Sequence, residues 1–469
     1  MAAAAVTADV APEKKEIGGP LSRCVVRSRK LMDSIFGHVS AATMADGRTL
    51  ALKCSRIVPA EERRKQSHDD PLKDSALLYF LQAAATPNCS ETGDKVREKT
   101  REEVREKAPE KKDYVGGDDV RGNVERISNE FGTLLRAPAD HMRQIAELCQ
   151  RALWDEIRTA RTEEEEWEEL WSFRELSPYG DFFECVNLTN TAPSDVAALL
   201  APVARALALG HAIGLAHCDV KPENLLVVRA ADGSGLASGS RGTAPMRKGS
   251  RSLLVENGFS LRIIDLGHAI ADAEFAVDTS VCAAEACSVC RAVLADPLGV
   301  ANVAGVAGVP VPVPADPLGA AEVVDEQSGK GHAWRDVPYT GEVHGSPTFR
   351  APELVGLDYS LQHWHHPPSS DVFAMGRTIA CCILGAYDHA EWWRGGKTDS
   401  FGPALANLVR AATHPERRWR PSMATVAHEL ALAAAVRTLT SSSLSPSCSP
   451  SCSPSYSPSY SASTVAATC

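Results

Sequence analysis

The sequence HCDVKPENLLV, residues 217–227, decides how the rest of the chain is read. Asp219 is a candidate base, because its carboxylate can accept or orient the proton of a hydroxyl group. Lys221 follows two residues later and can place a positive charge on the same side. Asn224 offers an amide oxygen, which is the hard type of ligand that Mg²⁺ prefers. A base, a cation and a metal ligand at this spacing are the parts that phosphoryl transfer requires from a protein.

Two other segments carry groups that suit the same chemistry. LRIIDLGHA, residues 261–269, begins as an apolar strand and delivers Asp265 to a turn that a glycine can close. Asp265 is therefore a second candidate ligand for Mg²⁺. GSPTFRAPEL, residues 345–354, supplies a hydroxyl at Ser346 and a carboxylate at Glu353.

Together the three segments resemble the catalytic loop, the metal-binding turn and the end of the activation segment of the eukaryotic protein kinases. The Lys-Pro-Glu-Asn form of the first segment is similar to the serine/threonine kinases. The resemblance implies an α+β, two-lobed fold, in which a small lobe holds an antiparallel sheet and a helix and a larger lobe is mainly helical. It also implies that the chain transfers the γ-phosphate of ATP, bound with Mg²⁺, to serine or threonine hydroxyls of protein substrates.

The resemblance gives the polar residues of the first two segments definite roles. Asp219 and Lys221 would be the catalytic residues, and Asn224 and Asp265 would hold the metal ion. Leucine replaces the phenylalanine that usually follows the metal-binding aspartate, which is a tolerated apolar exchange.

Other residues would support this site. The hydroxyl of Ser346 would bond the catalytic aspartate and lysine. Glu353 would pair with Arg420 in the sequence PERRWRPSM. Asp371, in the helical sequence SSDVFAMGRTI, would hold the backbone of the catalytic loop, which is a structural role.

The N-terminal part matches the family less well. The strand sequence ALKCS places Lys53 where the family's lysine holds the α- and β-phosphates, with Ala51 beside the nucleotide. The glycine-rich loop should read Gly-x-Gly-x-x-Gly-x-Val, but residues 32–39 read MDSIFGHV. Only Gly37 and Val39 match, so backbone approach to the phosphates is expected near Gly37. The side chains at the other two glycine positions and the added aspartate predict altered ATP affinity or loop geometry.

Lys53 needs a carboxylate from the next helix to aim its ammonium group. Glu130, in NEFGTLLRAPADHM, is the preferred candidate, and this choice makes the charged stretch at about 57–122 an insertion ahead of that helix. Asp74, in the earlier helical sequence DSALLYFLQAA, is the competing candidate. The sequence leaves both open.

FRELSPYGDFFECV, residues 173–186, resembles the segment that joins the two lobes of the family. Backbone groups from Glu175 to Ser177 would then bond the adenine edge. Asp181 would meet the ribose or a basic residue of the substrate. Arg174 falls at the position that guards the back of the nucleotide pocket, where an arginine is unusual.

Local patterns predict the secondary structure around these motifs. Short apolar runs with turn signals predict strands at 24–26, 36–43 and 49–55, with Asp46-Gly47 as a hairpin turn. Helix formers dominate 124–175, including EEEEWEELW, and 196–217 also reads as an apolar helix.

The expected domain organisation follows from shifts in composition. We expect a disordered N-terminus at 1–20, a small lobe at 21–176, a large lobe at 177–436 with insertions at about 230–256 and 272–340, and a disordered Ser/Pro-rich tail at 437–469.

Two departures from the family bear on regulation. Cys218 replaces the arginine that grips a phosphorylated activation-segment residue, so we expect that phosphorylation of this segment is not the main switch. The long segment after Asp265 contains Cys282, Cys287 and Cys290, whose spacing favours free thiols over zinc ligands.

Cys218 and the altered glycine loop keep an alternative open, a pseudokinase or scaffold with weak or no nucleotide turnover. The lysine and metal positions are all retained, which favours an active kinase. A small-molecule kinase of related fold is a weaker third reading, because GSPTFRAPEL resembles kinases that act on proteins.

The composition sets the remaining expectations. The chain has 469 residues and is 44% hydrophobic, so it can bury a sizeable core. Its net charge is −11. The acidic balance argues against a nucleic-acid partner. The start lacks a signal peptide and the apolar run at 300–314 is broken by glycine and proline, so no membrane partner is expected. A cytoplasmic or nuclear location follows, while the protein substrate and the oligomeric state stay open.

Overall fold

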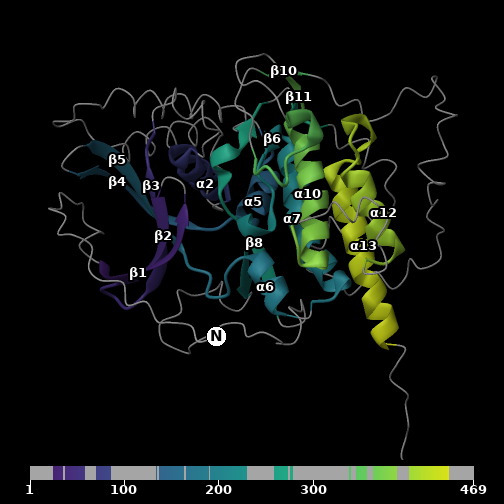
Figure 1. Cartoon of the computed structure of the whole chain (residues 1–469), viewed down its shortest axis with the longest axis horizontal. Helices are drawn as coiled ribbons and strands as arrows, with labels where there is room; N and C mark the ends of the chain where they lie inside the picture. The colour runs from purple at the N-terminus through teal and green to yellow at the C-terminus, as the bar shows by residue number, and fades with distance from the viewer. Residues whose placement is uncertain are drawn as a thin grey trace, which may run out of the picture.

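The structure is a computed structural model of the whole chain. It describes residues 25–34, 37–58, 70–85, 134, 137–162, 165–189, 191–229, 258–272, 275–277, 337–339, 345–355, 363–387 and 401–442. An antiparallel sheet lies on one side of the molecule and most helices lie on the other (Figure 1). This mixed α+β arrangement is compatible with a two-lobed fold.

The sheet has five strands in the order β1-β2-β3-β5-β4. Its strands are β1 (Val25–Ser34), β2 (Gly37–Met44), β3 (Thr49–Arg56), β4 (Ala152–Arg161) and β5 (Glu166–Glu175). Every neighbouring pair is antiparallel. The expected turn between β2 and β3 is present, because Gly47 adopts φ 84° and its N–H donates to Met44 O at 2.9 Å.

The prediction of helix for the stretch up to Glu175 is wrong for β4 and β5. Glutamate favours helix, but a strand places Trp167, Trp171 and Phe173 on one face and Leu170 and Ser172 on the other. The indole N–H groups of Trp167 and Trp171 both donate to Glu169 at 3.0 Å on one face. The other face buries Leu170 and Ser172. Tertiary burial of one face therefore overrides the local preference for helix.

Helix α2 (Pro71–Ala85) packs against the sheet and corrects the predicted insertion at about 57–122. Leu77, Leu78 and Leu81 are fully buried in the main core, so this part of the stretch is structural. The helical sequence DSALLYFLQAA, which carries the competing candidate Asp74, is this helix. The rest of the insertion, 59–69 and 86–122, lies outside the described residues.

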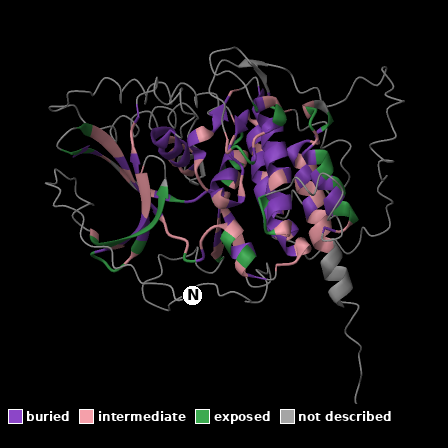
Figure 2. Ribbon diagram, in the orientation of Figure 1, coloured by how far each residue is buried: buried purple, intermediate pink, exposed green. Residues whose placement is uncertain are grey.

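The helical part is built around α7 (Pro193–Ala212). The helices packed around it are α5 (Ala139–Leu148), α10 (Pro367–Leu384) and α13 (Met423–Ser442). Helix α12 (Pro403–Ala412) packs on α10 and α13, and α6 (Phe182–Leu188) packs on α10. Figure 2 shows α7 and α10 as largely buried helices.

Helix α7 is the one helix of the described residues that is long and apolar enough to cross a membrane. About two thirds of its apolar window (67%) is buried inside the protein, as in the core helix of a globular domain. The expected helix at 196–217 thus exists, although it begins at Pro193 and ends at Ala212.

Short strands frame the segment 217–224. Strand β6 (Leu215–Ala216) pairs with β9 (Ile270–Ala271), and β7 (Leu225–Arg229) pairs with β8 (Phe259–Ile263). These two ladders fix both ends of HCDVKPEN and bring the turn at Asp265 beside it.

Some expected boundaries differ from the structure. Helix α13 continues to Ser442, so the predicted tail does not begin at 437. The predicted insertion 272–340 includes β10 (Val337–Tyr339), which pairs with β11 (His363–His365), and the buried Phe275. Residues 1–20, 230–256, the remaining tail and the three clustered cysteines lie outside the described residues.

Candidate active site

The loop that carries Asp219 is held by a buried carboxylate from α10. Asp371 accepts the backbone N–H groups of His217 and Cys218, each at 2.8 Å. Its third contact is His211 Nε2 at 2.9 Å. Cys218 has φ 64°, which is unfavourable for a residue with a side chain. Asp371 therefore stabilises a strained turn directly before Asp219, in the structural role expected for it.

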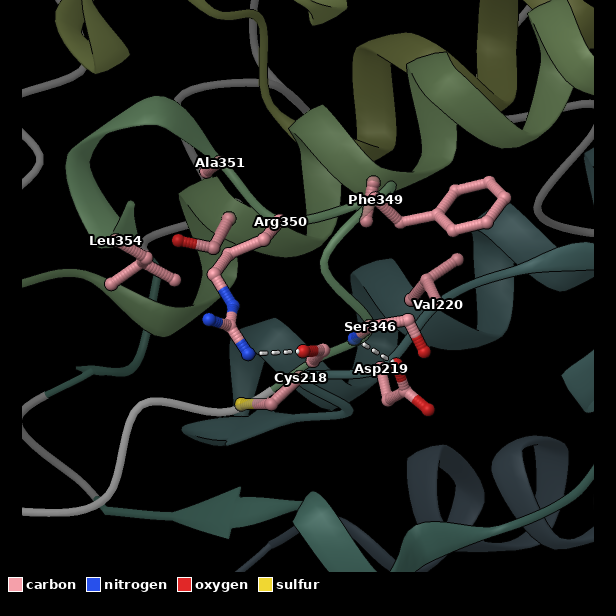
Figure 3. A pocket seen from close by; sticks show the side chains of 11 residues that line it. Cys218, Asp219, Val220, Ser346, Phe349, Arg350, Ala351 and Leu354 are labelled. Atoms are coloured by element: carbon pink, nitrogen blue, oxygen red, sulfur yellow. Dashed lines mark hydrogen bonds between the residues drawn. The ribbon is translucent and has the colours of Figure 1, made fainter. Parts of the chain in front are cut away.

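Asp219 is buried and its carboxylate receives three hydrogen bonds. Lys221 Nζ donates to Oδ2 at 2.7 Å, and Asn224 Nδ2 donates to the same oxygen at 2.9 Å. The backbone N–H of Ser346 donates to Oδ1 at 2.7 Å (Figure 3). The side-chain hydroxyl of Ser346 meets Lys221 Nζ at 2.6 Å. Residues separated by more than 120 positions thus surround one carboxylate.

The charges around Asp219 keep it ionised. Burial would raise the pKa of this carboxyl, but the positive charge of Lys221 and its hydrogen bond outweigh burial and lower the pKa below its ordinary value. Burial would lower the pKa of Lys221, but Asp219 outweighs burial there and raises it. Asp219 is consequently a weak base that is well suited to orienting a hydroxyl group.

Asp265 lies at the end of β8 with φ 64°, so its side chain leaves the strand at a sharp turn. Lys53 Nζ, from β3, donates to Asp265 Oδ1 at 2.7 Å. The same ammonium group lies 3.4 Å from Asp74 Oδ2 on α2. Asp74 was the competing candidate for the partner of Lys53, whereas Glu130 lies outside the described residues.

The side-chain oxygens of Asp265 and Asn224 suit Mg²⁺ that is also bound by substrate phosphates. The described residues hold no group of three or more His, Cys, Asp or Glu side chains placed for a metal ion. Mg²⁺ commonly binds through one or two protein oxygens together with substrate phosphates. Asp265, 26% exposed, can supply a carboxylate oxygen. The NH₂ group of Asn224 faces Asp219, which leaves its amide oxygen to be the ligand.

The β2–β3 ladder places three further expected residues near Lys53. Val39 lies directly opposite Lys53, and Ala51 is buried on the same strand. Gly37 lies opposite Ser55 on this ladder. A Cβ atom on Gly37 would lie 1.8 Å from Cys54 O, so this glycine is required by the sheet itself.

The segment after β5 makes many hydrogen bonds within the protein. Glu175 O accepts from Gln150 Nε2 at 2.7 Å, although a carbonyl oxygen can accept a second bond. Ser177 Oγ donates to Val227 O at 2.5 Å. Asp181 caps α6 by accepting the Glu184 N–H at 2.8 Å, and burial raises its pKa. These three residues lie where the linking segment was expected, and their ligand contacts stay a prediction.

The segment 345–354 packs against the loop of Asp219. Figure 3 shows a pocket there, lined by Asp219, Ser346 and the Arg350 side chain among others. At the end of this segment, Glu353 accepts from the buried Arg420 through both carboxylate oxygens, at 2.6 and 2.7 Å. The pair expected from the sequence is therefore present, in the bidentate geometry that favours arginine.

Two functional contacts were not predicted. His211 supports Asp371 from within α7, and its only signal was a polar residue in an apolar helical run. Arg174 was singled out as unusual, but its partner could not be foreseen. Its guanidinium binds Asp74 at 2.9 Å in the interior.

Comparison with known proteins gives partial support for the family. The chain matches no protein-family profile. The serine/threonine-protein kinase DCLK1 of Rattus norvegicus is 30% identical over 109 residues, which cover 20% of this chain and 25% of that protein. This weak similarity hints at relatedness to serine/threonine kinases. The chain matches only about a quarter of that relative's length, so its activity does not transfer directly.

Proposed function

We propose that the chain is a protein serine/threonine kinase that transfers the γ-phosphate of ATP to protein hydroxyl groups. The observation that carries the proposal is the buried Asp219 carboxylate, bonded by Lys221, Asn224 and the Ser346 N–H. The Lys53–Asp265 contact at 2.7 Å adds a cation and a metal-binding oxygen from distant segments. The partial similarity to a serine/threonine kinase agrees with this choice of reaction.

In the proposed reaction, the substrate hydroxyl oxygen bonds to the γ-phosphorus as the bond from that phosphorus to ADP breaks. Asp219 orients this hydroxyl and accepts its proton. Lys221 holds the Asp219 carboxylate and the Ser346 hydroxyl together, so the carboxylate keeps one orientation. The Lys221 ammonium also offsets negative charge on the transferred group.

The remaining residues would bind the nucleotide. Lys53 would exchange part of its contact with Asp265 for the α- and β-phosphates. Asp265 and Asn224 would hold Mg²⁺, which neutralises the phosphate charge when it is bound. Backbone groups near Gly37 and from Glu175 to Ser177 would contact the phosphates and the adenine.

One observation favours the alternative, a pseudokinase with weak or no turnover. Strands β1 and β2 pair as far as Ser34 and Gly37, and Met32 and Ser34 occupy the two positions where the family uses its other glycines. Side chains at these positions keep the backbone from approaching a phosphate closely.

Phosphate transfer from ATP with Mg²⁺ to a generic basic protein separates the two functions. The kinase proposal expects incorporation on serine or threonine that falls by about 10²-fold or more in Asp219→Ala. If the wild type and Asp219→Ala incorporate the same amount of phosphate, the activity comes from a contaminant and the proposal fails. A shift in the melting temperature with ATP and Mg²⁺, but no transfer, would establish the pseudokinase.

A further inference from the structure

A buried ion pair behind the site is not used by the proposed reaction. Arg174 on β5 and Asp74 on α2 are 2.9 Å apart, and their side chains are 4% and 1% exposed. Arg174 also donates to Ser75 Oγ at 3.3 Å, which in turn lies 3.1 Å from Ser172 Oγ. The pair therefore belongs to a polar network that joins α2 to the sheet.

Asp74 is shared unequally between two cations. Arg174 Nη2 lies 2.9 Å from Asp74 Oδ2, whereas Lys53 Nζ lies 3.4 Å from the same oxygen. The shorter contact of Lys53 is to Asp265, at 2.7 Å. Arginine, which is more weakly hydrated than lysine, is the better partner for a carboxylate in the interior.

The other oxygen of Asp74 fixes the turn of the candidate site. Asp74 Oδ1 accepts the backbone N–H of Leu266, the residue after Asp265, at 2.8 Å. One carboxylate on α2 is thus bound to β5 through Arg174 and to the metal-binding turn through Leu266. Moving Asp74 would displace both contacts.

The guanidinium of Arg174 keeps its charge in the interior. Burial would lower its pKa, but the carboxylates of Asp74 and Asp155 outweigh burial and raise it. Asp155 lies on β4 directly opposite Ser172. Without Arg174, Asp155 would lose a positive charge that lowers its pKa, and Asp74 would keep the more distant Lys53 ammonium at 3.4 Å.

We propose that Arg174 is a positioning residue and the principal partner of Asp74, so that Lys53 is left to Asp265 and the nucleotide phosphates. The part that concerns the nucleotide rests on the proposed kinase function. In this arrangement the Asp74 carboxylate orients the turn at Asp265, while Arg174 neutralises the charge of Asp74.

A double-mutant cycle in urea unfolding tests the pairing without any activity. Arg174→Met combined with Asp74→Asn should show a coupling of about tenfold or more in the unfolding constant. The matched cycle of Lys53→Met with Asp74→Asn should show less than about threefold. Equal couplings, or a larger one for Lys53, would overturn the proposal. Arg174→Gln replaces Arg174→Met in the cycle if the latter does not fold.

The nucleotide readout separates positioning from packing. In Arg174→Met the unpaired Asp74 should draw Lys53 away, which raises KM for ATP about tenfold and changes kcat by less than about threefold. The Arg174→Met/Asp74→Asn double variant should return KM toward the wild-type value, because no unpaired carboxylate remains. Arg174→Lys should rescue part of the effect. A double variant whose KM is no better than that of Arg174→Met would contradict the proposal.

Arg158→Met is the matched control. Arg158 is another buried arginine of the sheet, but its guanidinium stacks 3.8 Å from the Trp171 ring centroid, on the face away from α2. Its loss should lower stability and leave KM for ATP within about twofold.

Failure of this inference is distinguishable from failure of the proposed function. ATP binding is followed by the melting temperature with Mg²⁺, so it does not depend on transfer. Should the wild type neither bind ATP nor transfer phosphate, the kinase proposal fails, and the unfolding cycles still decide whether Arg174 is the principal partner of Asp74.

Discussion

Replacing Asp371 by asparagine should destabilise the protein by disturbing one turn. The Asp371 carboxylate is 1% exposed and accepts two backbone N–H groups, at 2.8 Å each. Asparagine keeps the shape but has only one acceptor oxygen, so its NH₂ group must face one of the two N–H groups. Cys218, with φ 64°, then loses part of the support for its strained backbone.

The magnitude follows from the bonds that are lost. A hydrogen bond to a charged group contributes about 1.5–3 kcal/mol, and Asp371→Asn removes one such bond and weakens another. We therefore expect a loss of about 2–4 kcal/mol in the free energy of unfolding. Since Asp219 follows Cys218, phosphate transfer should also fall in the protein that remains folded.

Urea unfolding followed by circular dichroism measures the loss, with Asp140→Asn as the control. Asp140 is 76% exposed on α5 and forms a surface ion pair with Arg143, so Asp140→Asn should change the free energy of unfolding by no more than about 0.5 kcal/mol. A loss below about 0.5 kcal/mol for Asp371→Asn would refute the reasoning that this carboxylate holds the loop.

Three further predictions test separate parts of the structure. Gly37→Ala should cost about 1–3 kcal/mol in unfolding free energy, because the new Cβ would lie 1.8 Å from Cys54 O; an unchanged melting temperature would contradict this close approach. Glu353→Ala should cost about 3–5 kcal/mol because it leaves the buried Arg420 charge with backbone carbonyls but no carboxylate, and Glu353→Gln should cost less; equal losses would exclude the bidentate pair. The folded-state pKa of Asp219 is lowered, so its contribution to stability is present above about pH 3.9 and is lost as the pH falls through the folded-state pKa. Urea unfolding of the wild type and Asp219→Asn should therefore converge below about pH 4, and a constant difference would contradict the shift.

The residues closest to the chemistry were the most predictable. HCDVKPEN and the turn at Asp265 were identified from residue types that suit phosphoryl transfer, and the Glu353–Arg420 pair followed from the resemblance to protein-kinase motifs. The β2–β3 hairpin was also predicted, since Asp46-Gly47 suits a turn that requires a positive φ.

The errors arose where tertiary contacts override local composition. Glutamates in 166–175 suggested helix, but burial of alternate residues against α2 makes this segment a strand. Helix α2 was recognised as helical but was assigned to an insertion, because Glu130 was preferred to Asp74 as the partner of Lys53. Asp74 was one of two candidates in the sequence, but its contacts with Arg174 and Leu266 could not be foreseen.

Transfer of labelled γ-phosphate to a serine- and threonine-containing peptide library, by the wild type and by Asp219→Asn, tests the central claim most directly. The account predicts labelled serine or threonine with the wild type and a decrease of about 10²-fold or more with Asp219→Asn, which keeps the shape but not the base. Equal labelling by both proteins, or no labelling by a wild type that binds ATP and Mg²⁺, would contradict it.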